Sequence, residues 1–186
     1  MKTRFASNTT TKRRAARITQ PSLKSGEGVK IEKEININRS PEVLYGFWRH
    51  FENLPRFMSH IESVTERGAG TSHWVMRTSQ GKELEWDARI IEDRPNEMIS
   101  WQSLENADVD NAGSVWFSPS RRGGTTVKVS LKYSPPGGKL GAFLAKITGQ
   151  SAEKQIEHDL LEFKKMMESS SGGSSGQTTA PQTLVE

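Results

Sequence analysis

Four histidines and a short run of acids are the residues of this chain whose types suit acid–base or metal chemistry. The histidines are His50, His60, His73 and His158, and no two of them have the spacing of a metal-ligand pair. The chain has no cysteine to complete a ligand set. His158 precedes Asp159, but neighbouring helical residues point about 100° apart, so no dyad is expected. The sequence therefore predicts no metal site, no cofactor and only structural or surface histidines.

Three acids, Glu83, Glu85 and Asp87, alternate with apolar residues, and Arg89 continues the same spacing. A strand places such residues on one face, where they suit a solvated surface with cross-strand ion pairs. A general acid or base would instead need a buried carboxyl group with a raised pKa. No Ser-His-Asp arrangement can be read, and 68–70 is a Gly-Ala-Gly turn rather than a phosphate loop. We therefore predict no catalytic residue, and an enzyme is the less favoured reading.

The elements that position these residues follow from alternating apolar residues and turn signals. Strands are expected at about 29–37, 61–67, 72–79, 82–93, 97–104, 112–119 and 125–133. In segment 112–119, either Val115 and Phe117 or Trp116 could face inward. Ser40 and Pro41 begin a short helix that reaches about residue 51, and a second short helix is expected at about 55–60.

A long C-terminal helix is expected at about 140–167, after a Pro-Pro-Gly-Gly stop at 135–138. Its apolar stripe recurs every three or four residues. The stripe consists of Leu140, Phe143, Leu144, Ile147, Ile156, Leu160, Phe163 and Met167. Gly149 and its polar neighbours interrupt this stripe, so we expect a bend there, with 141–148 acting as a movable lid.

Composition divides the 186 residues into a domain at 29–168 and two tails that we expect to be disordered, 1–28 and 169–186. The first tail holds seven Lys or Arg and one acid, whereas the domain is nearly neutral. This balance argues against a nucleic-acid-binding domain. The basic tail suits either a solubilising arm or contact with an anionic membrane surface. A cytoplasmic location is expected, at the membrane periphery if the basic tail binds lipid, with organelle import as the alternative if 1–28 is a transit peptide.

Several local strings carry a family resemblance over about residues 29–168. They are FWRHFENLPRFM (47–58), SHWV (72–75), EWDA (85–88), RPNEMISW (94–101), AGSVWF (112–117), the turn at 135–141 and DLLEFK (159–164). The chain resembles the polyketide cyclase/dehydrase group of the START-like helix-grip superfamily (SRPBCC), most closely its coenzyme Q-binding branch and bacterial cyclase/dehydrase proteins. The resemblance implies an α+β helix-grip fold, in which seven curved antiparallel strands surround a long C-terminal helix.

This fold and the apolar inner faces favour a module that binds or carries a hydrophobic small molecule, such as a quinone, an isoprenoid or another lipid. The residues expected to line the site are Phe57, Trp86, Trp101, Tyr133, Phe143 and Ile147. Trp86 and Trp101 could equally be plain core. Two alternatives remain: a polyketide cyclase or dehydratase that uses the same cavity, and an interaction protein whose cavity is filled by its own side chains.

Overall fold

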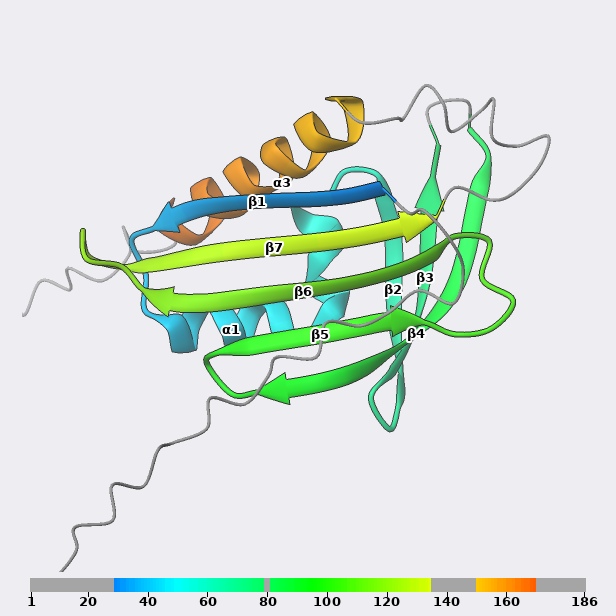
Figure 1. Cartoon of the computed structure of the whole chain (residues 1–186), viewed down its shortest axis with the longest axis horizontal. Helices are drawn as coiled ribbons and strands as arrows, with labels where there is room; N and C mark the ends of the chain where they lie inside the picture. Colours follow the sequence, from blue (N-terminus) through cyan, green and yellow to red (C-terminus); the bar gives the residue numbers. More distant parts are fainter. Residues whose placement is uncertain (1–28, 79–80, 135–149, 170–186) are drawn as a thin grey trace, which may run out of the picture.

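The computed structural model describes residues 29–78, 81–134 and 150–169, which form one sheet and three helical segments (Figure 1). The strands are β1 (Val29–Ile37), β2 (Ile61–Gly68), β3 (Thr71–Arg77), β4 (Glu83–Arg94), β5 (Met98–Ser103), β6 (Asp110–Pro119) and β7 (Thr125–Ser134). The helical segments are α1 (Pro41–Arg49), η1 (Phe51–Arg56) and α3 (Gln150–Ser169). Each predicted strand is present, with its bounds shifted by two residues at most.

The seven strands pair in the order β1-β7-β6-β5-β4-β3-β2, and every pairing is antiparallel. The first described strand therefore pairs with the last. Figure 1 shows α3 along one face of the curved sheet, beside β1, with the two short helical segments on the same side. This arrangement confirms the predicted α+β helix-grip fold.

Two short helical segments follow β1, as predicted, but the second begins earlier than expected. Pro41 opens α1, and Ser40 before it has extended backbone, as an N-cap residue does. The 3₁₀ segment η1 then starts at Phe51 and includes Pro55, so the expected helix at 55–60 is wrong. A 3₁₀ segment consists of single turns, so it tolerates proline, which lacks a backbone N–H donor. The amide of Phe57 closes η1 by donating to the carbonyl of Leu54 at 3.1 Å.

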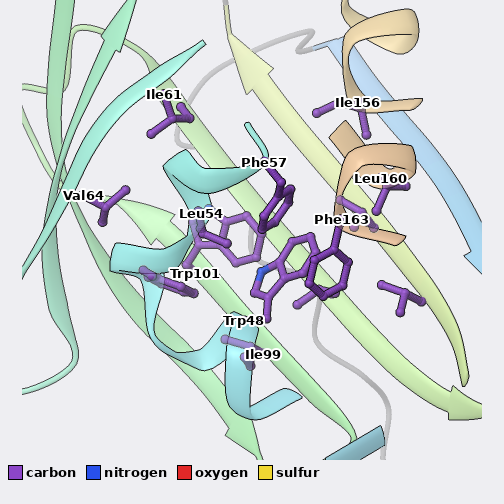
Figure 2. Close-up of a cluster of buried hydrophobic side chains, with 14 of the residues drawn as sticks. Trp48, Leu54, Phe57, Ile61, Val64, Ile99, Trp101, Ile156, Leu160 and Phe163 are labelled. Carbon is purple, nitrogen blue, oxygen red and sulfur yellow. The ribbon is translucent and has the colours of Figure 1, made fainter. Parts of the chain in front are cut away.

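The core lies between α3, the short helical segments and the facing side of the sheet. Figure 2 shows the side chains of Trp48, Phe57 and Phe163 meeting there. The ring centroid of Phe163 is 5.1 Å from that of Trp48 and 4.8 Å from that of Phe57. Aromatic pairs at such distances contribute beyond the area they bury. The ambiguity in β6 is also resolved, because Val115 and Phe117 are buried in this core.

The apolar stripe of α3 is buried as expected, with Ile156, Leu160, Phe163 and Met167 all in the core cluster. The predicted first part of the long helix, 140–149, and the lid at 141–148 lie outside the described residues. So do both predicted tails, except Ser169, which ends α3. The described helix ends at Ser169, two residues beyond the expected end. None of the described helices is long and apolar enough to cross a membrane.

The C-terminal end of α3 is fastened to the turn between β1 and α1. The guanidinium of Arg39 donates through Nε to the carbonyl of Met167 at 2.6 Å and through Nη2 to that of Glu168 at 3.3 Å. These carbonyls belong to the last turn of a helix, where no further turn supplies a donor. The Nζ of Lys164 adds a bond to the carbonyl of Asn36 at 2.7 Å. This end of the helix is therefore fixed in register with β1.

Candidate functional site

Three tryptophans on neighbouring strands form an aromatic wall on the helix-facing side of the sheet. They are Trp74 on β3, Trp86 on β4 and Trp101 on β5, and each is less than a tenth exposed. Trp74 lies nearly parallel to both partners, with ring centroids 5.8 Å from Trp86 and 6.5 Å from Trp101. Phe51 packs against Trp74 and Trp101 from η1. We call Trp74, Trp86 and Trp101 the tryptophan wall.

The cross-strand register sets this geometry. Trp74 pairs directly with Trp86, so both indoles project from the same side of the sheet. Trp101 pairs with Gly113 on β6, which has no side chain to occupy the space over which the indole extends. A Cβ at Gly113 would lie less than 3.0 Å from three atoms of that indole. Glycine at this position therefore lets Trp101 lie flat along β6.

The polar edges of the tryptophan wall differ. The indole nitrogen of Trp74 donates to the hydroxyl of Ser72 at 2.8 Å. The indole nitrogen of Trp86 is buried and has no hydrogen-bond partner within the described part of the chain. A buried N–H without an acceptor loses its hydration with nothing in exchange. Trp86 therefore offers a donor to any acceptor that reaches the wall.

The structure places four of the predicted site residues in or against one core. Phe57, Trp86 and Trp101 are buried members of the core cluster, and Tyr133 packs against it while partly exposed. Burial raises the pKa of Tyr133, so its hydroxyl remains protonated at neutral pH. Phe143 and Ile147 lie outside the described residues. Ligand binding by these six residues remains a prediction.

The concave face of the sheet is more exposed at the end where β1 begins and β7 ends. At the opposite end, Ile35, Val127 and Phe117 form a cross-strand row, in which Val127 and Phe117 are almost completely buried. At the more exposed end Val29 pairs with Tyr133, and both are only partly buried. Leu131, in the next row, is also partly buried. This apolar rim, Val29, Leu131 and Tyr133, reaches the surface at the end of β7 from which the chain leads on to 135–149.

A polar pair that the sequence analysis did not identify lies between the segment after η1 and α3. Asp159 is 1% exposed, and its Oδ2 lies 3.4 Å from the Nδ1 of His60. Its Oδ1 accepts a hydrogen bond from the Nε2 of Gln155 at 2.8 Å. Sequence reasoning tested Asp159 only against its neighbour His158. The available signal was the helical spacing, because Asp159 follows the buried Ile156 by three residues and precedes the buried Phe163 by four.

Burial shifts both groups of this pair toward their neutral forms. It raises the pKa of Asp159 to about 6 and lowers the pKa of His60 to about 4. Gln155 and the nearby His158 pull the pKa of Asp159 the other way, but less strongly. Desolvation penalises the charged form of either group. Asp159 is therefore a buried carboxyl group that titrates within two pH units of neutrality.

The acids that the sequence analysis weighed for catalysis take part in ion pairs on the opposite face of the sheet, as expected. Arg77 pairs with Glu83 at 3.0 Å, and Arg67 pairs with Asp87 at 3.2 Å. His73 contacts Asp87 through Nδ1 at 2.8 Å. Side chains of these pairs are largely solvated, where ion pairs contribute little. Among the described residues, no group of three or more His, Asp or Glu side chains is arranged to hold a metal ion.

The sequence profile of the family described as "Polyketide cyclase / dehydrase and lipid transport" matches residues 37–161. A 17.2 kDa protein from Streptomyces lincolnensis is 30% identical over 145 residues, which cover 75% of this chain and 89% of that protein. The matched region spans most of the described sheet and much of α3.

Solved structures agree with this match. A protein from Deinococcus radiodurans has a TM-score of 0.63 and 29% identity over 76% of this chain and 98% of its own. The Zhui aromatase/cyclase from Streptomyces sp. R1128 has a TM-score of 0.64 over 81% of this chain and 99% of its own, at 14% identity, which shows a shared fold. With the profile match and the Streptomyces lincolnensis relative, this places the chain in the polyketide cyclase/dehydrase and lipid transport family.

Proposed function

We propose that this protein binds and carries a hydrophobic small molecule between the sheet and the C-terminal segment of the chain. The observation that carries the proposal is the tryptophan wall together with the apolar rim, whose Leu131 is the cross-strand partner of the Gly113 beside Trp101. A site of this kind buries flat or branched apolar groups while a few polar atoms orient them. The lipid transport named in the family description supports the same class of ligand.

The wall favours a ligand with a flat ring that also bears a hydrogen-bond acceptor. Near-parallel indoles suit offset stacking on a planar ring. The unpartnered N–H of Trp86 supplies a donor beside that ring. A quinone with an isoprenoid chain has both features, since its carbonyl oxygens accept hydrogen bonds and its chain suits an apolar rim. It is also the ligand class that a coenzyme Q-binding relationship suggests.

A second candidate is a polyketide cyclase or dehydratase that uses the same site. One observation favours it: Asp159 is a buried carboxyl group whose pKa is raised to about 6, as a general acid or base requires. The similarity in fold to an aromatase/cyclase is consistent with it. Turnover of a poly-β-ketone analogue, measured by the appearance of an aromatic product, separates this candidate from a carrier.

Two measurements test the carrier proposal. The first is a native mass spectrum of the freshly purified protein, in which we expect a mass increment of several hundred daltons that disappears on organic extraction. The second is the uptake of an apolar fluorescent probe by three variants. Phe143→Asp should abolish uptake with the fold intact, and Leu160→Asp should unfold the domain because Leu160 is buried in the core.

The control is Ile91→Asp on β4, since Ile91 is 54% exposed and its replacement should leave both fold and uptake unchanged. Uptake by Phe143→Asp equal to that of the wild type would show that Phe143 does not line the site. Failure of the wild-type protein to take up any apolar probe, with no co-purified ligand, would reject the carrier function itself.

A further inference from the structure

His60 and Asp159 each present a buried polar atom that is available to a third group. Asp159 Oδ2 and His60 Nδ1 are 3.4 Å apart, and neither atom makes a hydrogen bond within the described residues. The carboxyl group is not loosely placed, because Gln155 on the preceding turn holds its other oxygen. A buried polar atom that is held in position and left unsatisfied requires an explanation. One explanation is that a ligand supplies the missing partner.

The position of the pair fits contact with a ligand. His60 follows η1 and precedes Ile61, and its side chain is 27% exposed while that of Asp159 is 1% exposed. The imidazole is therefore partly open to solvent, whereas the carboxyl group is not. Asp159 belongs to the same helix face as Ile156 and Phe163, which are buried in the core. The pair thus forms a polar edge of the apolar interior, three residues along the chain from Phe57.

The backbone holds His60 in place independently of its side chain. The amide of Arg77 donates to the carbonyl of His60 at 3.0 Å, and the amide of Ile61 donates to the carbonyl of Met58 at 2.9 Å. Its position is thus set by β2 and β3 rather than by Asp159. Two polar groups presented from separate, rigid elements are what a binding site for a small polar group needs.

We propose that His60 and Asp159 bind a hydroxyl group of the apolar ligand, with the carboxylate of Asp159 accepting a hydrogen bond from the hydroxyl and His60 as the second partner. This inference rests on the proposed carrier function and narrows its ligand to hydroxylated apolar molecules, phenols or alcohols. Of the quinone class it selects the reduced quinol, whose phenolic hydroxyls donate, over the oxidised quinone, whose carbonyls only accept. A carboxylate only accepts hydrogen bonds, so it selects a ligand that donates one. An ether or hydrocarbon of the same shape would leave the buried carboxylate unsatisfied, which costs affinity.

The ionisation of Asp159 supports this choice of ligand group. Its pKa of about 6 leaves the carboxyl group mostly ionised at pH 7.5. A hydroxyl group donates a stronger hydrogen bond to a charged carboxylate than to a neutral acceptor. A ligand carboxylate is disfavoured at the same pH because two negative charges would meet in a buried place.

The test compares 2-naphthol with 2-methoxynaphthalene, two fluorescent probes of similar shape of which only the first donates a hydrogen bond. Dissociation constants are measured at pH 7.5 by fluorescence titration of the full chain. For the wild-type protein we expect 2-naphthol to bind about tenfold more tightly or better, as a hydrogen bond to a charged group implies. In Asp159→Asn this preference should shrink to less than about threefold, with 2-methoxynaphthalene binding unchanged.

His60→Phe is the second variant, and it should also reduce the preference while keeping the apolar contacts. The control is Asp87→Asn, which removes a carboxylate from the solvated face of the sheet and should leave both affinities unchanged. Circular dichroism and thermal unfolding verify that each variant is folded.

The outcomes separate the two proposals. If both probes bind equally well to the wild type and to Asp159→Asn, the hydroxyl site is rejected and the carrier function stands. If neither probe binds to the wild type, the carrier function fails for aromatic ligands and the hydroxyl site fails with it. A preference for 2-naphthol that survives in both variants also overturns the assignment, because the donor is then recognised elsewhere.

Discussion

The indole of Trp101 on β5 lies over the backbone of Gly113, its cross-strand partner on β6. Trp101 has only 7% of its surface exposed, so it has little room to turn away from an added atom. This pairing is what extends the tryptophan wall across the middle of the sheet. The identity of residue 113 therefore decides the orientation of a side chain on another strand.

Gly113→Ala should destabilise the domain by about 1–3 kcal/mol, because the new Cβ would overlap the ring of Trp101. The matched control is Gly46→Ala in α1, where nothing lies within 4 Å of the new Cβ. That change should raise stability by up to about 1 kcal/mol, because alanine is the better helix former. Urea unfolding followed by tryptophan fluorescence measures both. Equal, small effects of the two substitutions would contradict the close approach of Trp101.

Arg39→Ala should lower the free energy of unfolding by about 1–3 kcal/mol, since it leaves the carbonyls of Met167 and Glu168 without their shared donor. Arg39→Lys should recover only part of the loss, because an ammonium group cannot reproduce the planar fork. Arg67→Ala is the control: Arg67 pairs with Asp87 in solvent and should cost less than about 1 kcal/mol. Amide hydrogen exchange should localise the Arg39 effect to the last turns of α3. Uniform exchange across the helix would argue against a local clamp.

The strands and the core stripe of α3 could be predicted from sequence because their signals are local. Alternation marks β7, and steps of three and four mark Ile156, Leu160 and Phe163. The helix expected at 55–60 is wrong because it begins at proline, whereas a 3₁₀ turn holds Pro55 inside η1. Local patterns thus identified the type of most elements and placed their boundaries less accurately.

The polar pair could not be predicted from sequence because it depends on two segments that are 99 residues apart in the chain. Helical spacing alone indicates that Asp159 borders a buried stripe. It does not indicate that His60 meets it there, since that follows from how the end of η1 packs against α3. The stacking of the tryptophan wall likewise depends on register between strands, which alternation alone leaves open.

The basic residues Lys12, Arg13, Arg14 and Arg17 give a separate prediction about membranes. Each should contribute about 1 kcal/mol to binding a surface of anionic lipid. Sedimentation with vesicles that contain roughly 30% phosphatidylserine, an anionic lipid, should show binding that falls steeply with salt. A variant with all four residues changed to glutamine should remain in the supernatant. Equal binding to neutral and anionic vesicles would remove the membrane hypothesis.

Asp159 and His60 should give the stability of the domain two opposing dependences on pH. The pKa of Asp159 is raised to about 6, so the folded state binds its proton more tightly than the unfolded chain does. The stability that this group contributes is present below pH 4 and is lost as pH rises toward 6. The pKa of His60 is lowered to about 4, so its contribution is lost as pH falls from 6.5 toward 4. The two effects offset each other in the wild-type protein.

Single substitutions should separate these effects. The free energy of unfolding of Asp159→Asn, minus that of the wild type, should increase between pH 4 and pH 7 by about 1–3 kcal/mol, because the variant lacks the group that loses stability there. For His60→Asn the same difference should decrease over this range, because the penalty for protonating a buried imidazole is gone. Subtracting the wild-type curve removes the contribution of all other titrating groups. Urea unfolding at half-unit pH steps measures both differences. If both are flat between pH 4 and pH 7, the two groups are not desolvated as the geometry between η1 and α3 implies.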